Sequence, residues 1–233
     1  MLGPIVNAVT VVICSLAGYF FVRNIPSGIE EIIRKAIGLF IIYVGIKGAF
    51  DSQRSLLFLL SLIGGGVTGE LINIDGLMNR LGLWAEKRFN VGSADKPFSK
   101  GFVAATILYC TGSMTIVGSL QSGMTGNHNL LFIKSILDGV TSIVFAASMG
   151  IGVAFSAVSV IVCEGGIALL SGVAKDFLSD EIIREMSAVG SLIVAAIGFN
   201  FLSVKEIKVA NFIPAVFIPL VYMLIEGLVL RSF

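Results

Sequence analysis

Charged residues are scarce in this chain, and their scarcity indicates its class. Of the 233 residues, 16 are Lys or Arg and 15 are Asp or Glu, which together make 13%. A soluble domain carries about 25% charged residues, because its surface must face water. The apolar residues, 56% of the chain, fall in long runs, and the mean hydropathy is +0.97. Many runs reach the ~20 residues that cross a hydrocarbon core, which predicts an all-α membrane protein with several transmembrane helices.

Other features that are missing from the sequence exclude further classes. The net charge is +1 and no long basic stripe occurs, so we expect no nucleic-acid partner. The three cysteines, Cys14, Cys110 and Cys163, lie within apolar runs and form no C-x-x-C pair, which argues against a disulfide framework and a structural metal site. No catalytic triad, phosphate-binding loop or HExxH motif is present, so we expect neither an enzyme nor a bound cofactor.

The apolar runs predict eight spans in a single transmembrane domain over residues 1–233. The first run lacks the basic start and the cleavage site of a signal peptide, so we expect a retained helix. Residues 75–98 form a linker, in which the spacing of Leu77, Leu81 and Trp84 predicts an amphipathic helix on the membrane surface, with a soluble linker helix as the alternative. The approximate spans are Leu2–Val22, Ile29–Phe50, Ser55–Ile72, Gly101–Gln121, Leu130–Met149, Val153–Gly172, Ile182–Phe201 and Val209–Leu230.

Basic residues in the loops predict the orientation. Lys and Arg are in excess on the cytoplasmic side of membrane proteins. The densest basic cluster lies in the loop after the third predicted span, and we therefore expect this loop to face the cytoplasm. With an even number of spans, both termini would then lie outside the cytoplasm. The residues of this cluster are Arg80, Lys87, Arg88, Lys96 and Lys100.

Two pairs of segments suggest that the chain repeats itself. Residues 7–14 align with residues 156–163, with four identical positions, and the charged block of residues 30–34 aligns with residues 180–184. Chance similarity between apolar segments explains the first match more easily than the second. We therefore predict a duplication, with one repeat over about 2–72, central spans over 101–149 and a second repeat over about 153–230. The displacement from span one to span six is odd, so the copies would cross the membrane in opposite senses, an arrangement typical of secondary transporters and shared by some channels.

Small and hydroxyl-bearing residues crowd the fourth predicted span. One interpretation is close packing between helices, which small residues permit. The other is a broken helix whose free backbone groups and neutral oxygens bind a solute or an ion. The sequence leaves both open. The predicted binding residues here are Thr111, Gly112, Ser113, Met114, Thr115, Gly118, Ser119, Gln121 and Ser122.

Two carboxylates lie near the middle of predicted spans, where a charge is costly unless it is paired or functional. Asp138 follows Lys134 by four residues, which places both on one helix face and predicts an ion pair. Glu164 is followed by Gly165 and Gly166, and a carboxylate beside two glycines suits a cation, a proton or a substrate amine; a structural partner is the alternative. We add these four residues, Asp138, Glu164, Gly165 and Gly166, to the predicted site. The coupling ion we expect is Na⁺, near Ser113, Asp138 and Glu164, or H⁺.

Three segments of the chain resemble one known family. Residues 112–123 (GSMTIVGSLQSG), 134–142 (KSILDGVTS) and 150–153 (GIGV) are similar to the bacterial YdfK/YqgA-like membrane proteins, a family of unknown function. The resemblance implies a bacterial inner-membrane protein, a homodimer and a role in transport, and it supplies no substrate. In that family a glutamine-glycine pair often takes the place of Glu164-Gly165, so Glu164 departs from the pattern.

The sequence thus predicts a secondary transporter of a small polar solute, either an amino acid or an organic anion. We expect coupling to Na⁺ or H⁺, alternating access, and contact with membrane lipid. One alternative is an ion channel or passive pore. The other is a component that transports nothing and assembles with a partner, for example in signalling.

Overall fold

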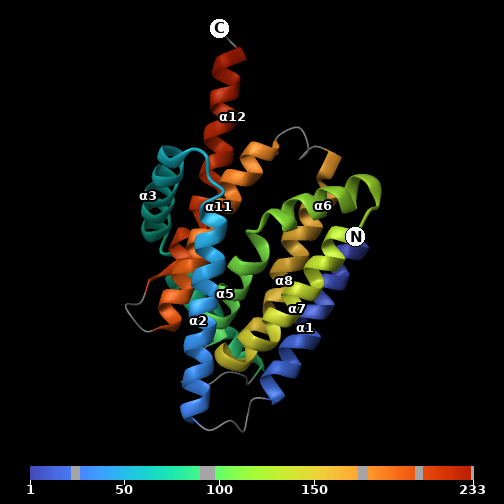
Figure 1. The fold of residues 1–233 in the computed structure, drawn as a ribbon, viewed down its shortest axis with the longest axis vertical. Helices are drawn as coiled ribbons and strands as arrows, with labels where there is room; N and C mark the ends of the chain where they lie inside the picture. Colours follow the sequence, from blue (N-terminus) through green and yellow to red (C-terminus); the bar gives the residue numbers. More distant parts are fainter. Residues whose placement is uncertain (22–26, 90–97, 173–177, 203–206, 232–233) are drawn as a thin grey trace.

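Helices form nearly all of the structure, as expected for backbone that must satisfy its own hydrogen bonds in lipid. The computed structural model describes residues 1–21, 27–89, 98–172, 178–202 and 207–231, and these contain no strand. Figure 1 shows their arrangement. The elements are α1 (Leu2–Phe21), α2 (Ser27–Ala49), α3 (Ser55–Ile72), α4 (Ile74–Phe89), α5 (Phe98–Cys110), α6 (Ser113–Thr125), α7 (Asn129–Met149), α8 (Gly152–Val160), the π-helix η1 (Ile161–Gly165), α9 (Gly166–Leu169), α11 (Asp180–Phe201), the 3₁₀-helix η2 (Val209–Phe217) and α12 (Ile218–Arg231).

Six helical stretches in the described residues are long and apolar enough to cross a membrane. The pair α5 and α6 makes a seventh candidate if the two count as one bent span. The second predicted span, over 29–50, corresponds to α2, whose charged residues Glu30, Glu31, Arg34, Lys35 and Lys47 keep it from meeting the same criterion. A helical membrane protein is therefore confirmed, whereas the count of eight spans stays a prediction.

Helices α2 and α11 pack closely and run antiparallel. A Cβ added to Gly45 would lie 2.4 Å from the backbone N of Ala195, and one added to Gly38 would lie 3.1 Å from the carbonyl O of Gly198. Glycine thus lets the two backbones approach, as small residues do between helices in membranes. Helix α3 meets η2 in the same manner, where a Cβ on Gly65 would lie 2.2 Å from the Cα of Ala215.

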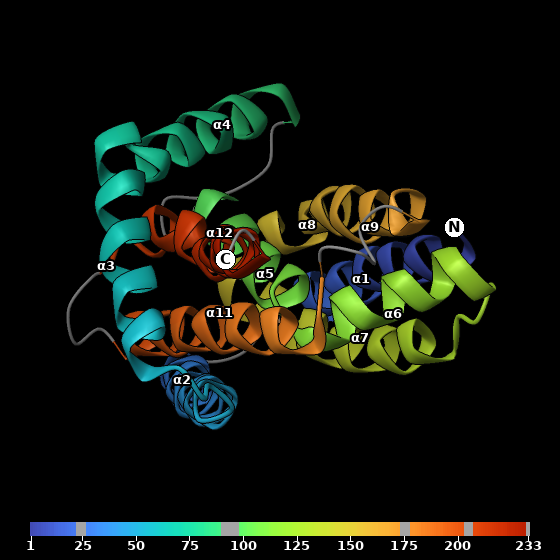
Figure 2. The same ribbon diagram turned by 90° about the horizontal axis from the view of Figure 1, so that it is seen from above.

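Helices α1 and α7 lie side by side and run in the same direction (Figures 1 and 2). Gly3 of α1 is next to Leu131, and Gly18 at its other end is next to Ile143. Helix α1 also packs on α8, which runs in the opposite direction (Figure 1). Helices α1 and α7, with the π-helix η1 that continues α8, hold the polar cluster described below.

The outer surface of the bundle is apolar. Large side chains such as Phe20 (61% exposed), Leu71 (82%) and Val162 (69%) lie on its outer faces. In water such a surface would drive aggregation, but in a bilayer it is matched to the lipid tails. The linker sequence forms α4 as predicted; its position on the membrane surface stays a prediction.

Two helices are interrupted at places that matter for the site. The fourth predicted span, over 101–121, is broken between Cys110 and Ser113, and the two parts are bent by 62°. The sixth predicted span, over 153–172, contains the π-helix at Ile161–Gly165. Such departures from α-helix widen the backbone locally and are frequent at functional sites.

Candidate functional site

The break between α5 and α6 is held by hydroxyl groups. Gly112 has extended backbone angles (φ −72°, ψ 149°), which ends the helical run. Thr111 Oγ1 donates to the carbonyl O of Ile107 (2.7 Å) in α5. Thr115 Oγ1, in the first turn of α6, donates back across the break to the carbonyl O of Tyr109 (2.7 Å). A break, one of the two alternatives that the sequence left open, is therefore present, and the hydroxyls of Thr111 and Thr115 stabilise it.

The other predicted residues of this region have differing surroundings. Ser122 is buried and its Oγ lies 2.8 Å from Nδ1 of His128, while Ser119 is buried and its Oγ has no partner. Gly118 is buried against Leu131, Met114 is half-buried, and Gln121 is exposed. The side chain of Ser113 lies outside the described residues. The hydrogen bonds of Thr111, Thr115 and Ser122 therefore go to the helix break and to His128, rather than to the two carboxylates.

The π-helix places Glu164 inside the bundle. Its side chain is fully buried; Gly165 is also buried, whereas Gly166 is half-buried. A π turn inserts an extra residue into the helical repeat, so the side chains that follow it face a different direction than in a continuous α-helix. Glu164 is thereby directed toward α1 and α7, where its partners lie.

Four polar side chains meet where α1, α7 and η1 come together. Asn7 donates through Nδ2 to Oδ2 of Asp138 (2.9 Å) and to Oε1 of Glu164 (2.7 Å). Lys134 Nζ forms an ion pair with Asp138 Oδ2, and lies 3.3 Å from the same oxygen of Glu164 that Asn7 contacts. Asp138 and Glu164 are therefore bridged twice, once by an amide and once by an ammonium. We call these four residues the buried cluster.

The buried cluster has one more negative charge than positive when all its groups are ionised. Lys134 supplies one positive charge, and Asp138 and Glu164 supply two negative ones. Oε2 of Glu164 and Oδ1 of Asn7 are buried and have no hydrogen-bond partner. An unpartnered buried polar group is costly, and an excess buried charge more so. Such a site favours a ligand that brings a positive charge and a hydrogen-bond donor.

Further groups surround the buried cluster from α5 and η1. Lys134 Nζ lies 5.8 Å from the centre of the Tyr109 ring, a cation–π distance. The Tyr109 hydroxyl is 2.8 Å from Ser142 Oγ, and Cys163 Sγ donates to the carbonyl O of Cys110 (3.8 Å) at the end of α5. The broken helix and the π-helix thus meet beside the cluster.

Sequence reasoning identified Asp138, Glu164 and the pairing with Lys134, and it missed two partners. Neither Asn7 nor Tyr109 was among the predicted site residues. A single asparagine in an otherwise apolar run was the available signal for Asn7, since an amide in a membrane helix needs partners. The predicted Na⁺ site is untested, and the described residues contain no group of three or more His, Cys, Asp or Glu that could hold a metal ion.

Two other charged groups lie away from the buried cluster. Glu70, at the end of α3, is exposed and accepts from Lys208 Nζ (2.8 Å) and Asn211 Nδ2 (2.5 Å). The carboxylate of Glu70 raises the pKa of Lys208 above its ordinary value through this hydrogen bond. Glu70 therefore has a lysine and an asparagine as partners, as Glu164 does. Unlike Glu164, it is exposed, and it does not share these partners with a second carboxylate of the described residues.

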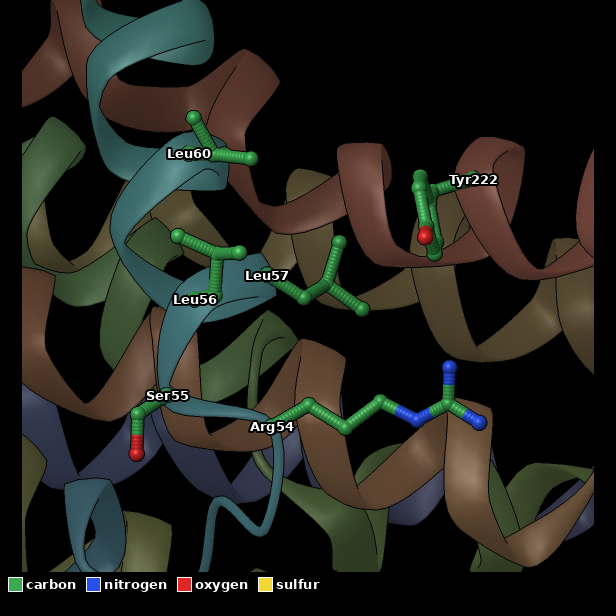
Figure 3. A pocket seen from close by; sticks show the side chains of 6 residues that line it. All are labelled: Arg54, Ser55, Leu56, Leu57, Leu60 and Tyr222. Carbon is green, nitrogen blue, oxygen red and sulfur yellow. The ribbon is translucent and has the colours of Figure 1, made fainter.

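The second group lies at the turn between α2 and α3. Arg54 donates to Glu226 Oε2 (2.6 Å) in α12 and to Glu181 Oε1 (2.8 Å) in α11, and these hydrogen bonds raise the pKa of its guanidinium. A cavity of about 290 Å³ lies beside it, and in Figure 3 Arg54 and Leu57 extend toward Tyr222 of α12. Because Arg54 is already paired with two carboxylates, we assign this cavity no ligand.

Comparison with known proteins agrees with the membrane architecture. A family model described as "Protein of unknown function (DUF554)" matches residues 2–224. The chain is 30% identical over 223 residues to the "Uncharacterized membrane protein YdfK" of Bacillus subtilis (strain 168), covering 94% of each chain. It is 26% identical over 219 residues to the "Uncharacterized protein YqgA" of Escherichia coli (strain K12), covering 92% of this chain and 93% of that protein. No solved structure matches the chain.

Proposed function

Because the chain belongs to the family described as "Protein of unknown function (DUF554)", whose description names no activity, we propose its function from the geometry of the buried cluster. The protein is a secondary transporter that moves a small polar solute, an amino acid or an organic anion, by alternating access and couples it to a cation gradient. The observation that carries this proposal is the excess negative charge of Asp138 and Glu164, bridged by Lys134 and Asn7 inside the bundle.

The position of the cluster supports transport over a purely structural role. Charged groups inside a membrane domain are costly and mark ion and substrate pathways. In transporters, discontinuous helices supply backbone groups at such sites. Here the cluster adjoins both a broken helix, at Thr111–Gly112, and a π-helix, at Ile161–Gly165. A structural ion pair would need neither interruption.

The packing of α2 on α11 supports the predicted inverted repeat. Residues 30–34 and 180–184 are 150 positions apart, and so are Gly45 and Ala195, which contact each other. Two copies related by a two-fold axis touch at equivalent positions where the axis passes between them. The antiparallel course of α2 and α11 agrees with an axis in the membrane plane, the arrangement that permits alternating access.

We extend the proposal to the setting of the protein. Its location is the bacterial inner membrane, with both termini outside the cytoplasm, and it acts as a homodimer. Lipid contacts cover the apolar outer faces. The cargo is a small solute rather than a nucleic acid, and the protein performs no covalent chemistry on it.

Uptake into proteoliposomes tests the proposed function. Purified protein is reconstituted, and labelled amino acids and carboxylates are supplied with an inward H⁺ or Na⁺ gradient. We expect saturable uptake that collapses when the gradient is dissipated. Glu164→Gln and Asp138→Asn should each lower uptake to the level of empty liposomes, because both remove charge from the buried cluster.

Glu70→Gln is the matched control, since Glu70 has the same kinds of partner at an exposed position. It should keep the uptake of the unaltered protein. Conductance without saturation, which persists in the absence of a gradient, would indicate a channel instead. Saturable uptake that is equal in all three variants would remove the cluster from the mechanism.

A further inference from the structure

We propose that the buried cluster binds a single proton, carried by Glu164, and that this proton is the coupling ion. The role of this proton as coupling ion rests on the proposed transport function. Proton binding by the cluster is a separate property and does not depend on transport. In the unprotonated state the cluster has a net negative charge. In the protonated state Glu164 is neutral, and the remaining charges of Lys134 and Asp138 cancel.

The bridging groups leave little place for a metal cation. A metal ion shared by two carboxylates would sit between their facing oxygens. In this structure Lys134 Nζ and Asn7 Nδ2 already occupy that position, between Asp138 Oδ2 and Glu164 Oε1. Both present hydrogens with positive partial charge, which would repel a metal ion. The ammonium of Lys134 is in effect the internal cation of the site.

The unpartnered atoms fit a proton. Hard cations such as Ca²⁺ and Mg²⁺ take about six or more oxygen ligands. The buried oxygens of the cluster without a partner are two, Glu164 Oε2 and Asn7 Oδ1. A proton needs a single acceptor: an O–H bond forms at Oε2, and the carboxylate oxygen becomes a donor. The excess charge, which is the costliest feature of the cluster, disappears in the same step.

The other titratable groups near Glu164 do not supply the missing charge. Before α1 lies the amino group of Met1, whose side chain adjoins Gly165; this residue is exposed, and the ion pairs of the described carboxylates of the cluster are with Lys134 instead. On α1 the nearest titratable group is Cys14, which lies beside Gly139. On α5 they are Tyr109 and Cys110, and on η1 Cys163. Phenol and thiol groups are ordinarily uncharged near neutral pH. On α7 they are Lys134 and Asp138, already counted. The proton must therefore come from water on one side of the membrane, and it leaves to the other.

Infrared difference spectroscopy tests proton binding without any transport assay. The protein is held in lipid, and spectra at alkaline and acidic pH are compared. We expect the C=O band of a protonated carboxyl group to grow on acidification and to shift in D₂O. The band should be lost in Glu164→Gln and be unaffected by Glu70→Gln. Addition of Na⁺ at constant pH should leave it unchanged.

Two charge variants separate a coupled cluster from an isolated carboxyl group. Asp138→Asn removes the excess negative charge, so the band should appear only at lower pH, by about one to three pH units, the effect typical of one nearby charge. Lys134→Met removes the compensating charge, so the band should persist to higher pH. Even if Lys134→Met fails to fold, the Asp138→Asn and Glu164→Gln results decide the matter.

Three results would overturn the proposal. They are a band retained in Glu164→Gln, a band displaced by Na⁺ at constant pH, and a band whose pH dependence is the same in Asp138→Asn. Failure of uptake with the band intact would remove the proposed transport function but leave proton binding standing. Uptake driven by Na⁺, with no such band, would leave the proposed transport function standing but remove proton binding.

Discussion

At the scale of single residues, Lys134 is the group on which the buried cluster depends. It is 5% exposed, and it faces Asp138, Glu164 and the ring of Tyr109. Its ammonium lowers the cost of holding two carboxylates together in a medium of low dielectric constant. Removing one partner from a buried ion pair is more costly than removing the whole pair, because a charge is then left without compensation.

We predict that Lys134→Met lowers the free energy of unfolding by about 3–5 kcal/mol, the range typical of a broken buried ion pair. Unfolding in mixed micelles, followed by circular dichroism, measures the loss. The double variant Lys134→Met/Asp138→Asn restores the net charge of the unaltered cluster and should recover more than half of it. Equal instability of the two variants would mean that the packing of the lysine stem, and not its charge, stabilises the fold.

At the scale of helices, glycine determines how closely the elements approach. Gly45 of α2 faces the backbone of Ala195, whereas Gly28, in the first turn of the same helix, has no atom within 4 Å of an added Cβ. The hydrophobic effect does not drive helices together in lipid, so close contact and van der Waals packing carry the association. The spacing of α2 and α11 therefore depends on Gly45 and not on Gly28.

We predict that Gly45→Ala destabilises the protein by about 1–3 kcal/mol, because the methyl group would force the two backbones apart. Gly28→Ala is the matched control in the same helix, and it should be neutral or stabilising by up to about 1 kcal/mol, since alanine favours helix. Thermal unfolding in detergent compares the two. A loss of stability in both variants would point to a general intolerance of α2 and not to its contact with α11.

At the scale of the whole molecule, hydrogen bonds and ion pairs join the turn between α2 and α3 to α11 and α12, which lie more than 120 positions later in the chain. Ser52 Oγ and the backbone N of Gln53 donate to the fully buried carboxylate of Glu185, at 2.6 and 2.8 Å. Arg54 pairs with Glu181 and Glu226. These contacts join α3, α11 and α12 at one end of the bundle. Helix α3 then runs along η2, with Gly65 facing Ala215 and Gly69 facing Asn211, and α4 follows it.

We predict that the two ends of α3 lie on opposite sides of the membrane. Cysteine is introduced at Asp51 or at Arg88 in a chain whose three native cysteines are replaced, and intact cells are treated with a membrane-impermeant maleimide. Asp51→Cys should be labelled from outside, and Arg88→Cys only after permeabilisation, as the positive-inside rule requires. The reverse pattern would invert the orientation, and equal labelling of both would show that α3 does not span.

The sequence by itself determined the class of the protein and the approximate position of its helices, and it pointed to Asp138 and Glu164, the two carboxylates that meet in the buried cluster. Long apolar runs determine the class and the helices, because a run of about 20 apolar residues has few alternatives to a membrane helix. A carboxylate within such a run stands out because its charge is costly there unless it is paired or functional. The pairing of Asp138 with Lys134 also followed, since residues four apart share a helix face. These are local properties of the chain.

Only the tertiary structure decided which groups meet. Asn7 and Glu164 are 157 positions apart, and no spacing rule connects them. The two interruptions also depend on packing: Thr115 stabilises the break through a carbonyl on the other side of it, and the π-helix at Glu164 changes the direction of a side chain without a signal in the residue pattern. Contacts between distant helices are set by the close approach of backbones, which depends on every residue of both faces. That is why the cluster could be suspected from Asp138 and Glu164 but not assembled before the fold was known.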